Sequence, residues 1–323
     1  MKTRLTERLD IAHPVISAPM ALAAGGALAA AVSRAGGLGL IGGGYGDRDW
    51  LAEQWRAAGN ASVGCGFITW ALDRDPALLD AVLSRAPRAI FLSFGDPMPY
   101  AEAIREAGAL LICQVQTKRD GERALDCGTD ILVAQGAEAG GHGERRATMT
   151  LVPELADLIA ARAPETLLCA AGGIADGRGL AAALALGADG ALVGSRLWAS
   201  EEALVHPNML AAAVAAGGDD TIRSRVMDIA RHLDWPERYT ARVLKNAFTE
   251  RWHGDVDGLL ALAETEAARW KAAWQSGDVA VANTFVGEAA AMIDGIEPAG
   301  ALVERMVAEA ERRIETLEAC RGG

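Results

Sequence analysis

Short apolar runs recur along the first two thirds of the chain. Eight of them are rich in β-prone residues, and alanine-rich stretches with helical periodicity, such as 77–85 and 99–107, lie between most of them. The starts of most neighbouring runs lie 20 to 26 residues apart, which is the size of one strand–helix unit. The runs are 15–18 (VISA), 38–41 (LGLI), 62–68 (SVGCGFI), 89–94 (AIFLSF), 110–115 (LLICQV), 130–134 (DILVA), 167–171 (LLCAA) and 190–193 (GALV).

The order of these runs predicts a barrel. The phrases AGGLGL, EAGALLI, DCGTDIL and ALGADGALV share one pattern, in which a helix ends at glycine and a strand follows at once. Continuous apolar strands indicate a parallel sheet that is buried on both faces. Eight such units favour an α/β fold of the eight-stranded (β/α), or TIM, barrel type over residues 1–200. An open doubly wound sheet is the alternative, but no GxGxxG motif follows the first run.

The pattern changes after about residue 200, where helical periodicity replaces the strand-like runs. Segment 301–317 (ALVERMVAEAERRIETL) is amphipathic, and Trp270 and Trp274 lie one helical turn apart, so we expect both to pack in a core. We therefore expect a smaller, mostly helical second domain over residues 201–285 that covers the site. Residues 286–323 are predicted to form C-terminal helices that return to the barrel.

Composition and charge exclude several classes of protein. Half of the residues (51%) are hydrophobic and 23% are charged, as in soluble globular proteins. A net charge of -12 and the lack of a basic run argue against nucleic-acid binding. Five scattered cysteines without a CxxC pair argue against a disulfide framework or a zinc site, and they fit a cytoplasmic protein. The uncharged segment 15–32 contains one proline and two glycines, so we expect a strand, a loop and a helix there instead of a membrane span.

One gap between runs is longer than the others. Roughly 37 residues separate the starts of the runs at 130 and 167, and they include AQGAEAGGHGERRATMT (134–150). A segment that follows a strand of a parallel barrel emerges at the face where active sites lie. His142 in this loop is therefore a candidate catalytic residue, although an incidental loop histidine is the simpler alternative. Glu138 is expected either to orient the loop or to pair with Arg145 or Arg146, and the alternative is a solvated acid without a specific role. His13, His206, His232 and His253 are weaker candidates.

Two glycine-rich turns predict a phosphate site. AAGGIADG (170–177) and VGSR (193–196) follow the last two runs, and barrels of this type bind phosphate with these two loops and a helix N-terminus. The alternative is that the glycines only make tight turns. The other rim segments, APMA (18–21), GGGYG (42–46) and QVQT (114–117), offer backbone surface and one amide, but no pair of acids and no His/Cys cluster. This rim suits a flat cofactor with a phosphate tail, which suggests flavin mononucleotide (FMN).

The chain resembles the nitronate monooxygenase family, formerly called 2-nitropropane dioxygenases. The resemblance covers most of residues 10–200 through HPVISAPMA, AGGLGLIGGG, ILVAQGAEAGGHG and AAGGIADGRGLAAALALGADGALVGSRL, and it is most specific in AQGxEAGGH. It continues weakly through LKNAFTERW and NTFVGEAAAMIDGIEPA. It implies an FMN-dependent TIM barrel with a smaller domain over the flavin, and it assigns His142 as the catalytic residue that faces the flavin. The cofactor contacts that it implies are Ala18, Pro19 and Met20 at the ring, Gln114 at its polar edge, Gly136 and Gly141 near the ribityl chain or ring, and Gly172, Gly173, Gly194 and Ser195 at the phosphate.

The same resemblance implies oxidation of alkyl nitronates or nitroalkanes by molecular oxygen. A neutral histidine would take the α-proton of a nitroalkane, whereas a protonated one would hold the nitronate, and a pKa near 6.5 allows either. The alternatives are an FMN-dependent NAD(P)H oxidoreductase, of the quinone reductase or enoyl-acyl-carrier-protein reductase type, and a flavin-free barrel that binds a phosphate ligand. We expect a small-molecule substrate, no metal, and no nucleic-acid or membrane partner, with a homodimer as an open alternative.

Two departures from the family pattern are expected to alter the substrate pocket. Many members have an asparagine at the end of the third strand, where this chain reads GFITW with Phe67 and Trp70. Many members follow the histidine with Arg-Gly, where this chain reads GERR.

Overall fold

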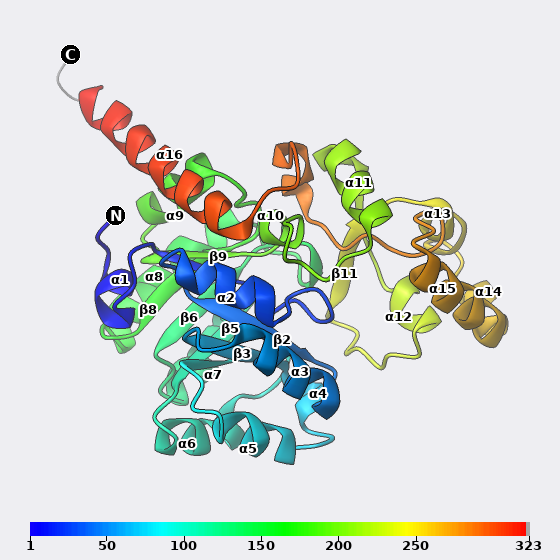
Figure 1. Ribbon diagram of the computed structural model, residues 1–323, viewed down its shortest axis with the longest axis horizontal. Coiled ribbons are helices and arrows are strands. Elements are labelled where there is room, and N and C mark those ends of the chain that lie inside the picture. The colour runs from blue at the N-terminus through cyan, green and yellow to red at the C-terminus, as the bar shows by residue number, and fades with distance from the viewer. Residues whose placement is uncertain (321–323) are drawn as a thin grey trace.

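The computed structural model describes residues 1–320, and its first two thirds form a barrel of parallel strands (Figure 1). All eight predicted strands are present, most of them within one or two residues of the predicted bounds. The second strand runs three residues further than predicted, through three glycines, of which Gly42 and Gly44 pair with β3 while the register shifts at Gly43 between them. The strands are β1 (Val15–Ser17), β2 (Gly39–Gly44), β3 (Val63–Ile68), β4 (Ala89–Ser93), β5 (Leu110–Val115), β6 (Ile131–Gln135), β8 (Leu167–Ala171) and β9 (Gly190–Val193).

The strands close into a ring, which decides between the two predicted topologies. Their hydrogen-bonded order is β1-β9-β8-β6-β5-β4-β3-β2, and all the pairs are parallel. A bridge between Ile16 and Leu38 joins the two ends of this order. The Ser17 N–H donates to the Leu38 carbonyl at 2.9 Å, and the Leu38 N–H donates to the Val15 carbonyl at 3.0 Å. The fold is therefore a TIM barrel and not an open doubly wound sheet.

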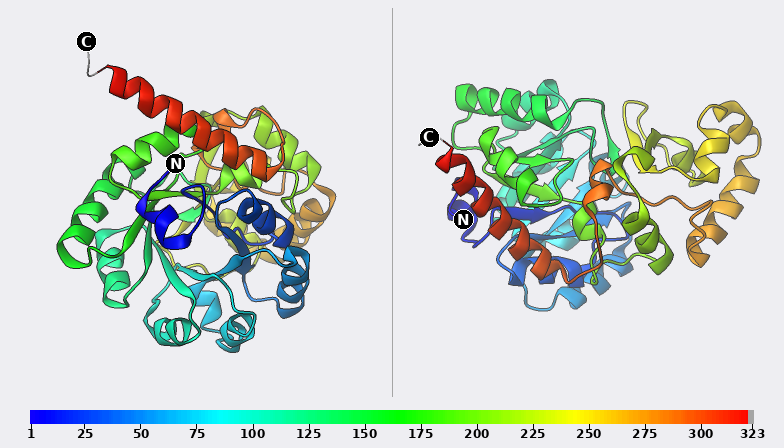
Figure 2. Two further views of the ribbon diagram at one scale, coloured as in Figure 1. Left: turned by 60° about the vertical axis from the view of Figure 1, so that its left-hand side comes forward. Right: turned by 90° about the horizontal axis from the view of Figure 1, so that it is seen from above.

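Helices surround the barrel and close one end of it. The helix α1 (Arg4–Leu9) lies across the end where the strands begin, and its Leu5 and Leu9 pack with the inward residues Ile16 and Phe91 (Figure 2). The outer helices are α2 (Gly26–Arg34), α3 (Arg48–Ala58), α4 (Thr69–Leu72), α5 (Ala77–Leu83), α6 (Met98–Glu106), α7 (Lys118–Asp126), α8 (Thr148–Arg162), α9 (Gly177–Ala185) and α10 (Ser195–Trp198). Because α1 fills the bottom of the barrel, only the opposite end is left for a site.

Residues 200–298 lie over that opposite end, and we call this region the cap. Its core includes Met209, Phe248 and Trp252, and the rings of Trp270 and Trp274 stack with centroids 5.1 Å apart. The cap contains α11 (Pro207–Ala215), α12 (Val226–Ala230), α13 (Ala247–Trp252), α14 (Val256–Ala261), α15 (Ala263–Ser276) and two 3₁₀ turns, Gly218–Asp220 and Glu288–Met292. After it, α16 (Ala299–Ala319) returns to the barrel and packs on α9, where Glu309 accepts a hydrogen bond from the Gly177 N–H at 3.1 Å. The last predicted residues, 321–323, lie outside the described part of the chain.

Besides its helices, the cap contains two short strands that the sequence pattern after residue 200 does not show. β10 (Thr221–Ser224) and β11 (Thr240–Leu244) pair antiparallel in the cap, and the histidine loop adds β7 (Gly141–Gly143) as a third strand. The segments TIRS and TARVL are too short, and interrupted by too many polar residues, to show a strand pattern. This sheet joins the cap to the barrel rim, because Ala241 lies opposite His142.

Segment 15–32 forms β1, a turn and most of α2, as expected. Among the described residues, no helix has the length and apolar character needed to cross a membrane. The strand cysteines Cys65, Cys113 and Cys169 are buried, and burial raises the pKa of Cys65 and of Cys113 to about 12.

The contact between α2 and β2 allows a test of barrel packing. A Cβ at Gly39 would lie 1.7 Å from the Ala29 carbonyl oxygen, so strand and helix would have to separate. We predict that Gly39→Ala lowers the free energy of unfolding by about 2 kcal/mol or more. Gly295→Ala is the control, because no atom lies within 4 Å of its added methyl. Urea unfolding midpoints measure both changes, and equal midpoints would contradict the packing described here.

Candidate active site

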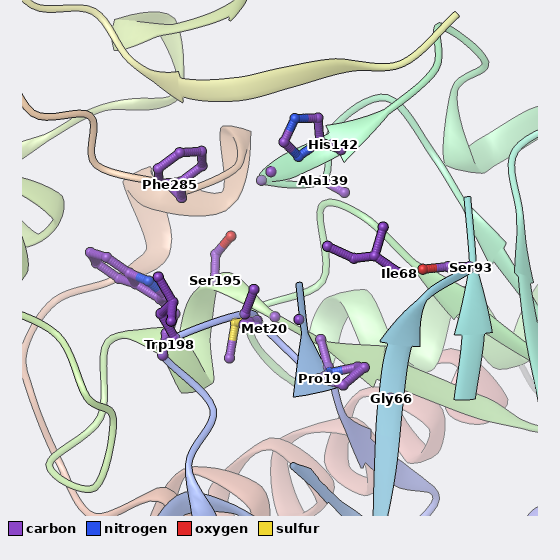
Figure 3. A pocket seen from close by; sticks show the side chains of 18 of the residues that line it. Pro19, Met20, Gly66, Ile68, Ser93, Ala139, His142, Ser195, Trp198 and Phe285 are labelled. Carbon is purple, nitrogen blue, oxygen red and sulfur yellow. The ribbon is translucent and has the colours of Figure 1, made fainter. Parts of the chain in front are cut away.

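A deep pocket lies where the barrel strands end, beneath the cap (Figure 3). Gly66 and Pro19 form part of its floor, and a Cβ on Gly66 would lie 2.3 Å from the Pro19 ring, so only glycine fits there. Ten of the eleven site residues predicted from the sequence line this one pocket. They are Ala18, Pro19, Met20, Gln114, Gly141, His142, Gly172, Gly173, Gly194 and Ser195.

Gly136, the eleventh predicted residue, is not part of the pocket lining. A Cβ there would lie 2.0 Å from the Thr148 hydroxyl oxygen and 2.4 Å from a carboxylate oxygen of Glu138. The structure therefore gives this glycine a packing reason, because the histidine loop folds tightly over the start of α8 at this point.

The two glycine-rich turns meet at one end of the pocket. Gly172 and Gly173 have φ values of +102° and +75°, in the left-handed region that favours glycine. No hydrogen bond within residues 1–320 uses the backbone N–H of Gly172, Gly173 or Gly194. These three N–H groups lie at the pocket and have no hydrogen-bond partner in the described part of the chain. Such a cluster of unpaired backbone donors is the arrangement that binds phosphate oxygens. The Ser195 hydroxyl lies beside them and accepts a hydrogen bond from the Gly287 N–H of the cap at 2.9 Å.

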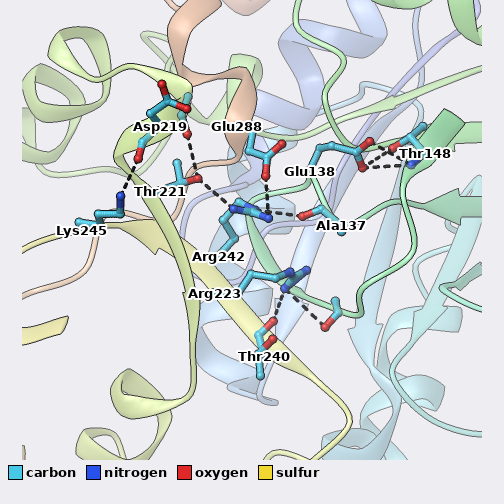
Figure 4. Close-up of polar contacts among 12 residues, drawn as sticks. Ala137, Glu138, Thr148, Asp219, Thr221, Arg223, Thr240, Arg242, Lys245 and Glu288 are labelled. Carbon is cyan, nitrogen blue, oxygen red and sulfur yellow. Dashed lines mark hydrogen bonds and ion pairs between the residues drawn. The ribbon is translucent and has the colours of Figure 1, made fainter. Parts of the chain in front are cut away.

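The histidine loop is held from the barrel side by Glu138 (Figure 4). Its carboxylate accepts hydrogen bonds from the Thr148 N–H at 3.0 and 3.1 Å and from the Thr148 hydroxyl at 2.8 Å. The predicted pairing of Glu138 with Arg145 or Arg146 is not present, because Arg146 pairs with Glu154 at 2.6 Å. Glu138 therefore orients the loop by binding the first turn of α8.

The cap holds the same loop from the other side. Arg242, on β11, donates to the Ala137 carbonyl at 2.9 Å and pairs with Glu288 at 2.8 Å (Figure 4). The loop is therefore fixed at both ends, although its glycines would leave it flexible in isolation.

His142 is buried in the roof of the pocket, above Met20 and Ser195 (Figure 3). Its Nε2 lies 2.9 and 3.0 Å from the two carboxylate oxygens of Asp228, a buried residue of α12. Because a carboxylate can only accept, Nε2 carries the proton, and the lone pair of the neutral ring is on Nδ1. No sequence pattern points to Asp228, which lies 86 positions from His142 in a segment without any motif.

Burial lowers the pKa of His142 below its ordinary value of 6.5. The hydrogen bond to Asp228 acts in the opposite direction, and the positive charges of Arg231 and Arg223 add to the lowering. The ring is therefore neutral near pH 7 and can accept a proton.

Aromatic side chains cover His142. The Trp235 indole lies parallel to the imidazole, with ring centroids 3.4 Å apart and an interplanar angle of 6°. Its Nε1 donates to the Tyr45 hydroxyl at 3.1 Å, and Phe94 meets its ring edge-on at 5.1 Å. We call residues 231–239, which carry Trp235, the lid segment. Because Trp235 covers one face of the imidazole, only the other face of the ring is left open to the pocket.

The two departures from the family pattern both lie against this lid segment. Arg238 of the lid donates to Glu144, the acid of GERR, at 2.6 Å and also pairs with Asp120. Trp70 of GFITW meets Trp235 at 5.3 Å, and Phe67 lines the pocket. The departures therefore affect the side of the pocket that a substrate would contact.

Other residues that line the pocket also carry no clear signal in the sequence. Arg231, Trp235 and Phe285 come from the cap, where no periodicity marks them. His206 and Trp274, the latter expected only to pack, line the pocket as well. His253 does not, and its Nδ1 lies 3.0 Å from the Ser224 hydroxyl.

Comparison with known proteins agrees with this geometry. The family model for nitronate monooxygenase matches residues 2–63 and 71–309. A nitronate monooxygenase of Neurospora crassa is 32% identical, over 94% of this chain and 91% of that protein. The structure of FabK from Thermotoga maritima is similar, with a TM-score of 0.86, 31% identity and 99% of both chains covered. A nitroalkane oxidase from Streptomyces ansochromogenes has a TM-score of 0.82 at 25% identity, over 96% of this chain and 99% of that one.

The bond between His142 and Asp228 makes a testable prediction. Asp228→Asn removes the negative charge that opposes burial, so the pKa of His142 falls further below 6.5. NMR titration of the histidine ring protons measures this change. Asp234→Asn, an exposed position of the same lid segment, is the control and leaves the titration unchanged. A pKa of His142 that rises in Asp228→Asn would contradict the arrangement.

Proposed function

The chain belongs to the nitronate monooxygenase family, and we propose that it oxidises alkyl nitronates or nitroalkanes with molecular oxygen at a bound FMN. The observation that carries this proposal is the setting of His142, a buried neutral base with one defined tautomer in the roof of the pocket. The names of the similar proteins support the same chemistry, since they include nitronate monooxygenase and nitroalkane oxidase.

The residues present fit FMN. The unbonded N–H groups of Gly172, Gly173 and Gly194 would hold its phosphate, and the Ser195 hydroxyl lies beside them. The flat floor at Pro19 and Met20 would support the ring system, with the Gln114 amide at its polar edge. When bound, FMN would supply the redox chemistry, while the protein supplies position, electrostatics and exclusion of water.

His142 would act as the general base for a nitroalkane. The α-carbon loses its proton to the lone pair of Nδ1, because Nε2 is occupied by Asp228. The imidazolium that forms is stabilised by the Asp228 carboxylate, and the substrate becomes the anionic nitronate. A nitronate supplied as such needs no proton transfer. The lowered pKa favours the neutral base over the second predicted role, in which a protonated His142 holds the nitronate.

The lid segment would exclude water from this step. Trp235 covers one face of the imidazole, and Tyr45 and Phe94 surround Trp235. A pocket shielded in this way would strengthen the electrostatic interactions within it and would keep water away from the proton transfer.

Replacement of the base is the first test of the function. We expect His142→Ala to retain FMN and to lower kcat/KM for nitroethane by about 10²- to 10⁴-fold, which is the usual contribution of general-base catalysis. His253→Ala, outside the pocket, is the control. Unchanged turnover of nitroethane in His142→Ala would remove the proposed base.

Anaerobic stopped-flow mixing separates the alternatives in the same preparation. Bleaching of the flavin by a nitronate or nitroalkane, but not by NADH or NADPH, supports the proposal. Rapid bleaching by micromolar NADH or NADPH would instead favour the NAD(P)H oxidoreductase. A protein that stays colourless after addition of FMN would favour the flavin-free barrel.

The pH dependence follows from the direction of the pKa shift. The base must be deprotonated, and its pKa lies below 6.5, so kcat/KM for freshly dissolved neutral nitroethane should begin to fall at a lower pH than it would with an unperturbed histidine as the base. At lower pH it should fall, approaching tenfold per pH unit below the pKa. A rate that rises as the pH falls through 6 would show that the protonated ring is the active form.

A further inference from the structure

Arg231 places a positive charge in the pocket wall. It follows α12 directly, lines the pocket, and its side chain is only 15% exposed. Its guanidinium carbon lies 5.3, 5.6 and 5.7 Å from the ring centroids of Tyr45, Trp270 and Phe285. Aromatic rings at these distances attract the cation, and the Tyr45 hydroxyl beside it is a neutral hydrogen-bond acceptor that brings no negative charge.

The guanidinium of Arg231 lacks a carboxylate of its own. It has five N–H donors, and within residues 1–320 no carboxylate oxygen lies closer to them than 4.0 Å, so that the Tyr45 hydroxyl is a neutral partner only. The one carboxylate within 4.0 Å among residues 1–320 is Asp228, at 4.0 Å, and both of its oxygens lie against His142. A charge that is largely buried and weakly paired is unfavourable unless an anion completes the site.

The other arginines near the histidine loop are in a different situation. Arg242 pairs with Glu288, and Arg238 pairs with Asp120 and Glu144. Arg223 has two buried nitrogens without partners, but it packs on Gly143 outside the pocket lining. Among these four arginines, Arg231 alone lines the pocket, and its nearest carboxylate oxygen lies 4.0 Å away.

We propose that Arg231 is the residue that binds the anionic oxygens of the substrate and makes the enzyme select a planar oxyanion over a neutral molecule of the same shape. This inference rests on the proposed function, because a nitronate is such an anion. The two oxygens of a nitronate or a carboxylate match the planar fork of N–H donors that arginine presents. The same charge would stabilise a nitronate as it forms from a nitroalkane, when His142 removes the proton.

The surroundings of Arg231 define the rest of the substrate. Trp235, Trp274 and Phe285 also line the pocket, so an apolar group attached to the oxyanion would contact aromatic surface. The ligand class is therefore a small anion with a planar two-oxygen head and an aliphatic or aromatic tail. Loss of the arginine should weaken the binding of the head and leave the contacts of the tail intact.

The test compares a carboxylate with its neutral amide in the FMN-containing protein. Butyrate and butyramide are titrated by the quenching of tryptophan fluorescence, because Trp235, Trp270 and Trp274 surround the proposed site. In Arg231→Met the Kd of butyrate should rise at least tenfold, whereas the Kd of butyramide should change less than twofold. Arg231→Lys keeps the charge, so it should restore much of the butyrate binding, and it remains informative if the Met variant does not fold. Arg251→Met, an exposed arginine stacked on Trp252 at 4.3 Å, is the matched control.

A kinetic measurement completes the test. With propane 2-nitronate as substrate, Arg231→Met should raise KM at least tenfold, with a smaller effect on kcat. Equal wild-type affinity for butyrate and butyramide, or unchanged butyrate binding in Arg231→Met, would overturn the inference. Unchanged butyrate binding together with an altered spectrum of the reduced flavin would also overturn it. That result would show that the positive charge of Arg231 acts on the cofactor and not on the substrate. Butyrate binding that depends on Arg231 in a protein that oxidises no nitronate would support the anion site and reject the proposed function.

Discussion

The hydrogen bond between His142 and Asp228 joins the two parts of the molecule. The histidine lies in a glycine-rich loop of the barrel rim, and the aspartate lies in α12, the first helix after β10 in the cap. Pairing of β7 with β11 brings the two segments together, and the bond then fixes which ring nitrogen carries the proton. Without the cap, the imidazole would have neither a fixed tautomer nor a buried setting, so the neutral base depends on how the two parts pack.

The two parts contribute different chemistry to one pocket. The barrel lines the pocket with backbone. Gly66 in the floor of the pocket and Gly172 and Gly173 at one end of it carry no side chains. The cap contributes side chains, with Trp235 on the histidine and Arg231 in the wall. We infer that the barrel is built for the cofactor and that the cap decides which substrate meets it. Related chains could then keep one cofactor site and differ in the molecules they oxidise.

The barrel could be predicted because its signals are local. Each buried parallel strand is a continuous apolar run, and the long gap after the sixth run places His142 on the rim before any tertiary contact is known. The cap could not be predicted in the same way. β10 and β11 are short and partly polar, and the roles of Asp228 and Trp235 depend on packing across 86 and more positions of chain. The partner of Glu138 could not be predicted for the same reason. Glu138 binds Thr148 because the loop folds back on the start of α8, whereas the sequence suggested only nearby arginines of opposite charge.

The most direct test of the account is the protonation of the two ring nitrogens of His142. Nitrogen-15 NMR of the histidine side chains in the FMN-containing protein at pH 7 distinguishes a protonated nitrogen from one with a free lone pair. His142→Gln identifies the signal. The account predicts a neutral ring with the proton on Nε2, toward Asp228, and the lone pair on Nδ1. A ring protonated on both nitrogens, or a neutral ring with the proton on Nδ1, would contradict it.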